Sequence, residues 1–156
     1  MRMSINGIRL LAEWEGSRSQ VYQDALGKQT IGVGHLLTGR ELQTGQIMID
    51  GVPVNFYNGL TENQIFDLLA QDLERFERSV TEKVVVPLRQ SQFDALVSFS
   101  FNVGVGNFES STLLKVLNQG RYDEVPNEFR RWNKGNGKVL PGLVKRRENE
   151  IELWYS

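Results

Sequence analysis

Two carboxylates and a threonine occur at short intervals near the start of the chain: Glu15, Asp24 and Thr30. Eight residues separate Glu15 from Asp24, and five separate Asp24 from Thr30. Two carboxyl groups that face each other across a gap can cleave a glycosidic bond, one as proton donor and the other by activating water or as a nucleophile. The types and spacing of these side chains therefore suggest a glycosidase.

A helix that begins after Ser4 is expected to position Glu15, because Ser4 can cap a run of apolar residues at helical spacing. These apolar residues are Ile5, Ile8, Leu11 and Ala12. Gly16 is a natural C-terminal stop, so Glu15 lies in the last turn, where the helix dipole disfavours an ionised carboxylate. Glu13 is the rival carboxylate, but it lies about 200° round the helix axis from Glu15. Glu15 is therefore the better proton donor.

A hairpin is expected to position Asp24 and Thr30. Short extended runs at residues 20–23 and 29–33 flank the loop 24–28, in which Gly27 suits a positive φ. Asp24 then lies at the exit of one strand and Thr30 near the start of the next. Asp50-Gly51 between alternating apolar residues predicts a second hairpin at 46–56. The sheet should be two hairpins or a meander of three to four strands.

Helices should make up the rest of the chain. Thr61 and Gln64 form a capping box that opens a helix reaching to about residue 80, a rod of roughly 30 Å that could link two lobes. After Pro87 no strand pattern stands out. The further expected helices cover 91–101, the run from Ser110 or Ser111 to Gly120, 123–132 and the segment after Pro141, with a loop at 133–140.

Composition excludes several classes of site. The chain has 156 residues, no Cys and one His, so it has no disulfide, no thiolate metal site, no Cys nucleophile and no multi-histidine zinc site. We therefore expect neither a metal nor a cofactor. The first 16 residues hold no apolar run long enough for a signal peptide or a membrane span. We expect synthesis in the cytoplasm and no stable membrane association.

Seven basic residues without an intervening acid follow Glu128: Arg130, Arg131, Lys134, Lys138, Lys145, Arg146 and Arg147. Such a run could attract an anionic surface, or it could be solvated helix faces and a loop, and both interpretations stay open. Nucleic-acid binding is not expected, because the preceding 128 residues are net acidic and no binding motif accompanies the run.

His35 is more plausible as a structural residue than as a catalytic base. Asp72 falls beside the apolar stripe of the long helix, where an unpaired carboxylate would be costly. An ion pair between His35 and Asp72 would explain both residues and would raise the pKa of His35, adding stability at acid to neutral pH.

Three motifs together resemble the phage-type lysozymes, the endolysins of glycoside hydrolase family 24. They are Glu15-Gly16 followed by YQDALGKQTIGVGH at 22–35, QSQFDALVSFSFNVG at 90–104 and RRWNKGNGKVLPGLVKRR at 130–147. The resemblance implies a single α+β lysozyme-like domain of two lobes. A small antiparallel sheet lobe (about 15–60) would be joined by a long helix (about 61–80) to a helical lobe (about 81–156 with the N-terminal helix).

The resemblance also implies an activity, the cleavage of the β-1,4 bond between N-acetylmuramic acid and N-acetylglucosamine in peptidoglycan. Glu15 matches the family's proton donor, Asp24 the carboxylate that handles water and Thr30 the third active-site residue. The positions that match the saccharide cleft are Leu36, Phe101 and Ser111. Residues 43–59 match the family poorly, which leaves the rim of the cleft on the sheet side undefined.

Two other functions compete with this hypothesis. A lytic transglycosylase would cleave the same bond without water and would need only the acid, and a cell-wall binding module would need no chemistry. The presence of Asp24 and Thr30 at family spacing argues against the transglycosylase, and the presence of both Glu15 and Asp24 argues against the binding module. The resemblance further implies a monomeric endolysin that lyses the host, is made in the host cytoplasm, crosses the inner membrane through a pore made by a separate phage protein, and acts on the wall in the periplasm.

Overall fold

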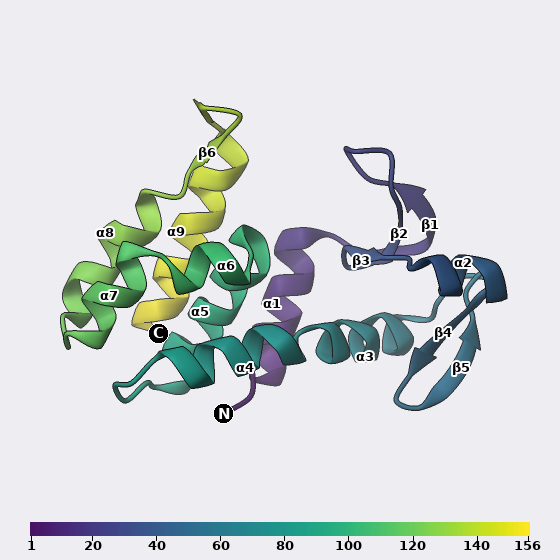
Figure 1. Cartoon of the computed structure of the whole chain (residues 1–156), viewed down its shortest axis with the longest axis horizontal. Coiled ribbons are helices and arrows are strands. Elements are labelled where there is room, and N and C mark those ends of the chain that lie inside the picture. Colours follow the sequence, from purple (N-terminus) through teal and green to yellow (C-terminus); the bar gives the residue numbers. More distant parts are fainter. The chain divides into compact units, whose positions relative to one another are not determined.

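The computed structural model describes residues 1–156, which form two compact units. One unit, here called the sheet unit, is Ile8–Leu73, and the other, the helical unit, combines Met1–Gly7 with Glu74–Ser156. Helix α1 (Ile5–Glu15) begins in the helical unit and ends in the sheet unit. The chain contains helices and small antiparallel sheets, as the expected α+β class requires (Figure 1).

Five short strands and two helices follow α1 in the sheet unit. They are β1 (Arg18–Gln23), β2 (Gln29–Gly32), β3 (His35–Leu36), α2 (Gly39–Thr44), β4 (Gln46–Ile49), β5 (Val52–Asn55) and α3 (Glu62–Asp72). Strands β1, β2 and β3 form one antiparallel sheet in that order, and β4 and β5 form a separate hairpin. Tyr22 faces Thr30 across β1 and β2, and Thr30 faces Leu36 across β2 and β3.

Turn and cap residues explain where these elements begin and end. Gly16 has a φ of 78° and donates its amide to Ala12, which ends α1 after Glu15. Asp50 and Gly51 have φ of 53° and 77°, the left-handed pair that a two-residue hairpin turn needs. A capping box between Thr38 and Glu41 opens α2, a helix that the sequence analysis did not identify.

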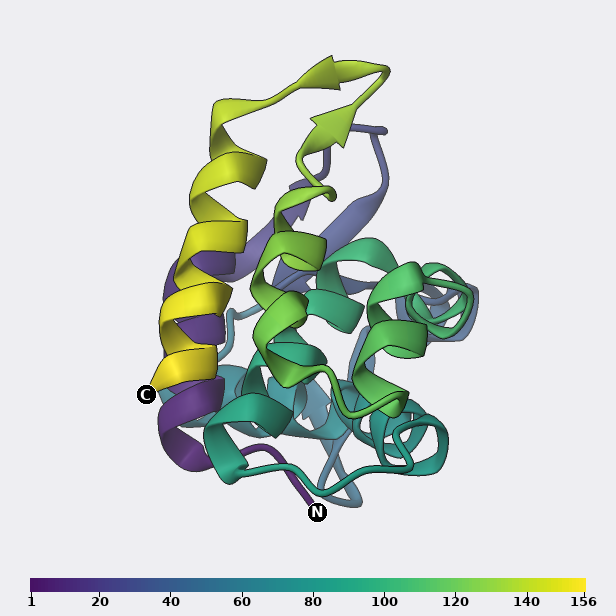
Figure 2. The same cartoon turned by 90° about the vertical axis from the view of Figure 1, so that its left-hand side faces the viewer.

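The helical unit contains six helices, one 3-10 turn and a small hairpin. They are α4 (Glu74–Lys83), α5 (Gln90–Val103), α6 (Val105–Glu109), α7 (Thr112–Asn118), η1 (Tyr122–Glu124), α8 (Val125–Arg130), β6 (Lys134–Gly135), β7 (Lys138–Val139) and α9 (Pro141–Tyr155). Helix α9 packs against α5 and α8 (Figure 2). Phe99, Phe129 and Trp154 are fully or almost fully buried there and meet edge to face.

Two elements differ from their expected form. The helix expected at about 61–80 is divided, because α3 ends at Asp72 and α4 begins at Glu74. Leu73 nevertheless keeps helical dihedral angles (φ −73°, ψ −17°) and donates its amide to the Leu69 carbonyl, so the interruption is one residue long.

The second difference is at residues 133–140, where a loop was expected and the hairpin β6–β7 is found. Asn136 and Gly137 have φ of 53° and 77° and make its turn. No helix in either unit combines the length and the apolar character that a membrane span needs.

Candidate active site

Glu15 is the last residue of α1, and its side chain is exposed. Trp14 beside it is partly buried, and Glu13 is exposed like Glu15. The backbone turns away at Gly16, so the Glu15 carboxyl lies at the point where the helix gives way to strand β1. A carboxyl group in this position can reach a ligand that lies against the end of the helix.

Asp24 follows β1 and shapes the loop that leads into β2. Its Oδ1 accepts hydrogen bonds from the amides of Leu26 (2.9 Å) and Lys28 (2.8 Å), and its own amide donates to the Lys28 carbonyl (2.8 Å). Gly27, with a φ of 79°, lets the chain return within four residues. Both loop bonds use Oδ1, so Oδ2 makes no hydrogen bond inside the protein and can bind water or substrate.

Thr30 is tied to the same loop from the other strand. Its Oγ1 donates to the Lys28 carbonyl (3.0 Å), the same oxygen that accepts from the Asp24 amide. Thr30 is only 2% exposed, and its pairing with Tyr22 and Leu36 fixes its place in the three-stranded sheet. The Lys28 backbone therefore connects Asp24 and Thr30 in one hydrogen-bond network.

His35 lies between two carboxylates. Its Nδ1 is 2.7 Å from Asp72 Oδ2, the contact expected from the sequence, and its Nε2 is 3.0 Å from Glu41 Oε1. Burial lowers the pKa of His35, but the hydrogen bonds and charges of Asp72 and Glu41 outweigh that effect and raise the pKa to about 9. With an acceptor at each ring nitrogen, the imidazole is doubly protonated. As a cation it links β3 to α2 and α3, and it does not act as a base.

Glu41 is the residue of this cluster that the sequence analysis missed. Its Oε1 also accepts from the Thr38 amide (2.9 Å), so one carboxylate both caps α2 and holds His35. The spacing Thr38-x-x-Glu41 is a visible capping-box signal that could have revealed the helix. The contact with His35 depends on the fold and has no sequence signal.

The three residues expected to bind saccharide are in different environments. Leu36 is 49% exposed on β3, directly opposite Thr30. Phe101 is partly buried near the end of α5, with its ring centroid 5.2 Å from that of Phe76. Ser111 is 4% exposed and caps α7, donating to the Phe108 carbonyl and accepting from the Leu114 amide. Ser111 therefore has a structural role in the fold.

The basic run after Glu128 does not form one continuous basic surface. Arg130 pairs with Glu148 (2.8 Å) and Arg131 with Glu128 (3.1 Å). Arg146 and Arg147 are buried at 7% and 1% exposure beside Glu150, inside the helical unit. The exposed cations that remain without an acidic partner are Lys134, Lys138 and Lys145. No group of three or more His, Cys, Asp or Glu side chains has the geometry to hold a metal ion.

Comparison with known proteins decides the family. The phage lysozyme family model matches residues 12–150. The chain belongs to the phage lysozyme family. Phage lysozyme relatives include the endolysin of Bacillus phage B103, which is 40% identical over the whole of this chain. This chain spans about half the length of that endolysin (55%) and of the one from Bacillus phage PZA (56%).

Solved structures show the same fold over the full length of the chain. A crystal structure of a P22 lysozyme mutant is 36% identical, covers 100% of this chain and 99% of its own, and gives a TM-score of 0.83. The muramidase domain of SpmX from Asticaccaulis excentricus is 34% identical, covers 99% of this chain and 98% of its own, and gives a TM-score of 0.80. These matches confirm the lysozyme-like α+β fold class.

Proposed function

We propose that the chain is a lysozyme that hydrolyses the β-1,4 bond between N-acetylmuramic acid and N-acetylglucosamine in peptidoglycan. Membership of the phage lysozyme family supports the substrate class. The observation that carries the chemistry is the Lys28 backbone network, which fixes Asp24 and Thr30 together and leaves Asp24 Oδ2 free. An aspartate that served only to form the turn would need no such partner on the next strand.

Glu15 acts as the general acid. Its protonated carboxyl donates to the glycosidic oxygen as the bond to the sugar carbon breaks, so the leaving hydroxyl departs neutral. Exposure at the end of α1 gives this side chain access to a bound glycan. The sugar carbon gains positive charge in the transition state, and a nearby ionised carboxylate stabilises that charge.

Asp24 and Thr30 handle the water that completes the reaction. Asp24 Oδ2 accepts a proton from the water while the water oxygen bonds to the sugar carbon. Thr30 donates its hydroxyl proton to the Lys28 carbonyl, so its oxygen keeps lone pairs that can accept a hydrogen bond from the same water. A carboxyl separation of roughly 6.5–9.5 Å accompanies inversion at the sugar carbon, whereas about 5 Å accompanies retention by a covalent route.

Product analysis tests this assignment. Purified peptidoglycan should give new reducing ends with the inverted anomer by NMR, and Asp24→Asn should lower kcat by roughly 100-fold or more. Asp50→Asn is the matched control, an exposed aspartate in the turn of the neighbouring hairpin. Retained products would contradict water activation by Asp24. 1,6-anhydro ends with an active Asp24→Asn would indicate a transglycosylase, and binding without product would indicate a wall-binding module.

The saccharide-binding assignment extends to Leu36 and Phe101, which place apolar surface on β3 and at the end of α5. A sugar ring can stack on an aromatic or aliphatic side chain, so Phe101→Ala should raise KM more than it lowers kcat. Ser111 contributes through the cap of α7, and Ser111→Ala should act on stability first. An unchanged KM for Phe101→Ala would remove that residue from the cleft.

We also propose that the protein acts as a monomer on the wall from the periplasmic side after synthesis in the host cytoplasm, and that export uses a separate pore-forming phage protein. Expression of this chain alone should leave cells intact, whereas co-expression with a pore-forming phage protein should lyse them. Lysis by this chain alone would contradict the export route and leave the enzymatic assignment untouched.

A further inference from the structure

The hairpin β6–β7 stands at the N-terminal end of α9, beyond the packed helices of the helical unit (Figure 2). A backbone hydrogen bond of 2.9 Å from Leu140 to Asn133 closes it, and Asn136 and Gly137 form its turn. Each strand is only two residues long, and most side chains of the hairpin are exposed. No part of the proposed chemistry uses residues 133–140.

Both faces of the hairpin combine a lysine with an apolar side chain. Lys134 lies directly opposite Val139 in the register, so these two side chains share one face. Leu140 continues the extended backbone of β7 (φ −108°, ψ 125°) and shares the opposite face with Lys138, two positions earlier. Both lysines are exposed, and Val139 and Leu140 are 55% and 41% exposed. The hairpin therefore presents charge and apolar surface on two sides at once.

The positive charge at this end of the helical unit has no balancing acid. No Asp or Glu occurs between Glu128 and Glu148, and both of these carboxylates already pair with arginines. A third exposed lysine, Lys145, follows near the start of α9. The formal net charge of the chain is −1, and removal of the three positive charges of these lysines would leave −4. An anionic surface would therefore attract the molecule at this end.

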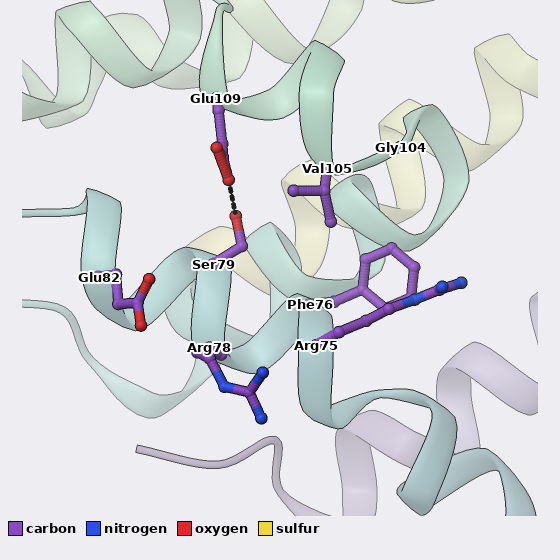
Figure 3. A pocket seen from close by; sticks show the side chains of 8 residues that line it. All are labelled: Arg75, Phe76, Arg78, Ser79, Glu82, Gly104, Val105 and Glu109. Atoms are coloured by element: carbon purple, nitrogen blue, oxygen red, sulfur yellow. Dashed lines mark hydrogen bonds between the residues drawn. The ribbon is translucent and has the colours of Figure 1, made fainter.

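A second group of cations in the helical unit differs in its balance of charge. Arg75 and Arg78 line a groove beside α4 (Figure 3). Glu82 and Glu109 line the same groove, and Glu109 accepts a hydrogen bond from Ser79 (3.1 Å). Positive and negative groups in the groove offset each other, so its attraction for an extended anionic surface is small. The hairpin is the better site for such a partner.

The two-sided arrangement indicates which anionic partner fits the hairpin. A rigid partner or a single polymer strand can cover only one face, which leaves the lysine and the apolar side chain of the other face in water. The headgroup layer of a lipid bilayer can surround both faces, with phosphates beside the lysines and acyl chains below them. Lysine suits this layer, because its methylene stem lies along apolar groups while its amine reaches a phosphate.

We propose that the hairpin inserts its turn into the headgroup layer of an anionic membrane and holds the protein reversibly at that surface. Val139 and Leu140 reach the boundary with the acyl chains, and the three lysines bind lipid phosphates. So few groups give a weak attachment, which salt weakens further. The attachment needs neither Glu15 nor Asp24, so it is separate from the proposed chemistry.

Vesicle binding tests this proposal. The full chain is sedimented with phosphatidylglycerol vesicles and with phosphatidylcholine vesicles, at low and at high salt. Wild type should bind only the phosphatidylglycerol vesicles, and high salt should release it. Lys134→Gln/Lys138→Gln should bind these vesicles roughly tenfold more weakly. The control, Lys83→Gln/Lys115→Gln, removes the same charge from two exposed lysines elsewhere in the helical unit and should bind like wild type.

Val139→Thr separates a lipid surface from an acidic polymer. It keeps the shape of the side chain and removes apolar surface, so it should weaken vesicle binding by roughly threefold and leave binding to immobilised polyphosphate unchanged. Binding of wild type to polyphosphate but not to vesicles would assign the hairpin to an acidic polymer and overturn the proposal. Equal vesicle binding by the two double variants, unchanged vesicle binding by Val139→Thr, or no vesicle binding by wild type would overturn it as well. Vesicle binding by a protein that releases no reducing ends from peptidoglycan would support the proposal and contradict the proposed function.

Discussion

Each unit buries a cluster of charged side chains. The central side chain is a cation between two carboxylates in the sheet unit and a carboxylate between two cations in the helical unit. In the sheet unit one imidazole, His35, is held between Asp72 and Glu41. In the helical unit one carboxylate, Glu150, is held between Arg146 (3.2 Å) and Arg147 (2.7 Å), with Ser98 donating at 2.7 Å. One cluster is centred on an imidazole whose pKa is raised to about 9, and the other on a carboxyl group beside guanidinium groups that stay charged at all ordinary pH values.

The two clusters also differ in how deeply their side chains are buried. Glu150 has no exposed side-chain surface, and Arg147 has 1%, whereas the side chains of His35, Glu41 and Asp72 keep 13%, 18% and 25%. Complete burial raises the pKa of the Glu150 carboxyl, and the two guanidinium groups and the Ser98 hydroxyl oppose that rise. We therefore expect the helical unit to depend more strongly on its cluster and the sheet unit to depend more strongly on pH.

The largest expected effect comes from removing Glu150. Glu150→Ala takes away the carboxylate that both buried arginines contact, so the free energy of unfolding should fall by about 3–5 kcal/mol. Denaturant unfolding of wild type and variant measures the difference. Glu148→Gln is the control, since that carboxylate pairs with Arg130 in an exposed position two residues earlier on α9. Similar small losses for both variants would contradict the contrast between the units.

The pH dependence of stability comes next. The folded pKa of His35, about 9, lies above its unfolded value of 6.5. The stabilisation is therefore complete below pH 6.5 and is lost as pH rises through 9. The loss should be roughly 2 kcal/mol once solvent screening is allowed for. Unfolding of wild type and His35→Asn from pH 6 to 10 tests this, because the difference between the two should shrink across that window. A constant difference would show that His35 is not charged in the fold.

The two carboxylates around His35 should differ in strength. Asp72, at 2.7 Å, should support the imidazolium more than Glu41, at 3.0 Å, which divides its Oε1 between His35 and the Thr38 amide. NMR titration of the His35 ring should therefore show a larger fall in pKa for Asp72→Asn than for Glu41→Gln. The opposite order would assign the main contact to α2 instead of α3.

The smallest expected effect is at Ser98. Ser98→Ala removes the hydroxyl that donates to Glu150 and accepts from Arg146, but both guanidinium groups still contact the Glu150 carboxylate, so the free energy of unfolding should fall by only about 1 kcal/mol. Thermal unfolding measures the change. A loss as large as that of Glu150→Ala would mean that the hydroxyl, rather than the two guanidinium groups, holds the carboxylate in the core.

Local chemistry explains why the elements that carry Glu15, Asp24 and Thr30 were predictable. The Ser4 hydroxyl oxygen accepts a hydrogen bond from the Gly7 amide in the first turn of α1, and Gly16 ends the helix after Glu15. These are short-range effects that residue type alone indicates. The loop from Asp24 to Lys28 likewise follows from Gly27 and from an aspartate that bonds amides two and four residues on.

Features that depend on packing were not predictable in the same way. Both interpretations of the basic run placed Arg146 and Arg147 at the surface, yet the packing of α9 against α5 buries both beside Ser98 and Glu150. The hairpin at 133–140 was missed despite its Asn136-Gly137 turn signal, because its strands are two residues long and too short for an alternating pattern. The contact between Glu41 and His35, which are six residues apart on α2 and β3, depends on how these elements pack and has no local signature.

The central claim is that Glu15 is the proton donor of a peptidoglycan hydrolase. Glu15→Gln keeps the size of the side chain and removes the transferable proton, and Glu13→Gln makes the same change at an exposed carboxylate two residues earlier on α1. Release of reducing ends from purified peptidoglycan should fall by roughly 100-fold or more for Glu15→Gln and stay near wild type for Glu13→Gln. Full activity of a folded Glu15→Gln protein would contradict the account.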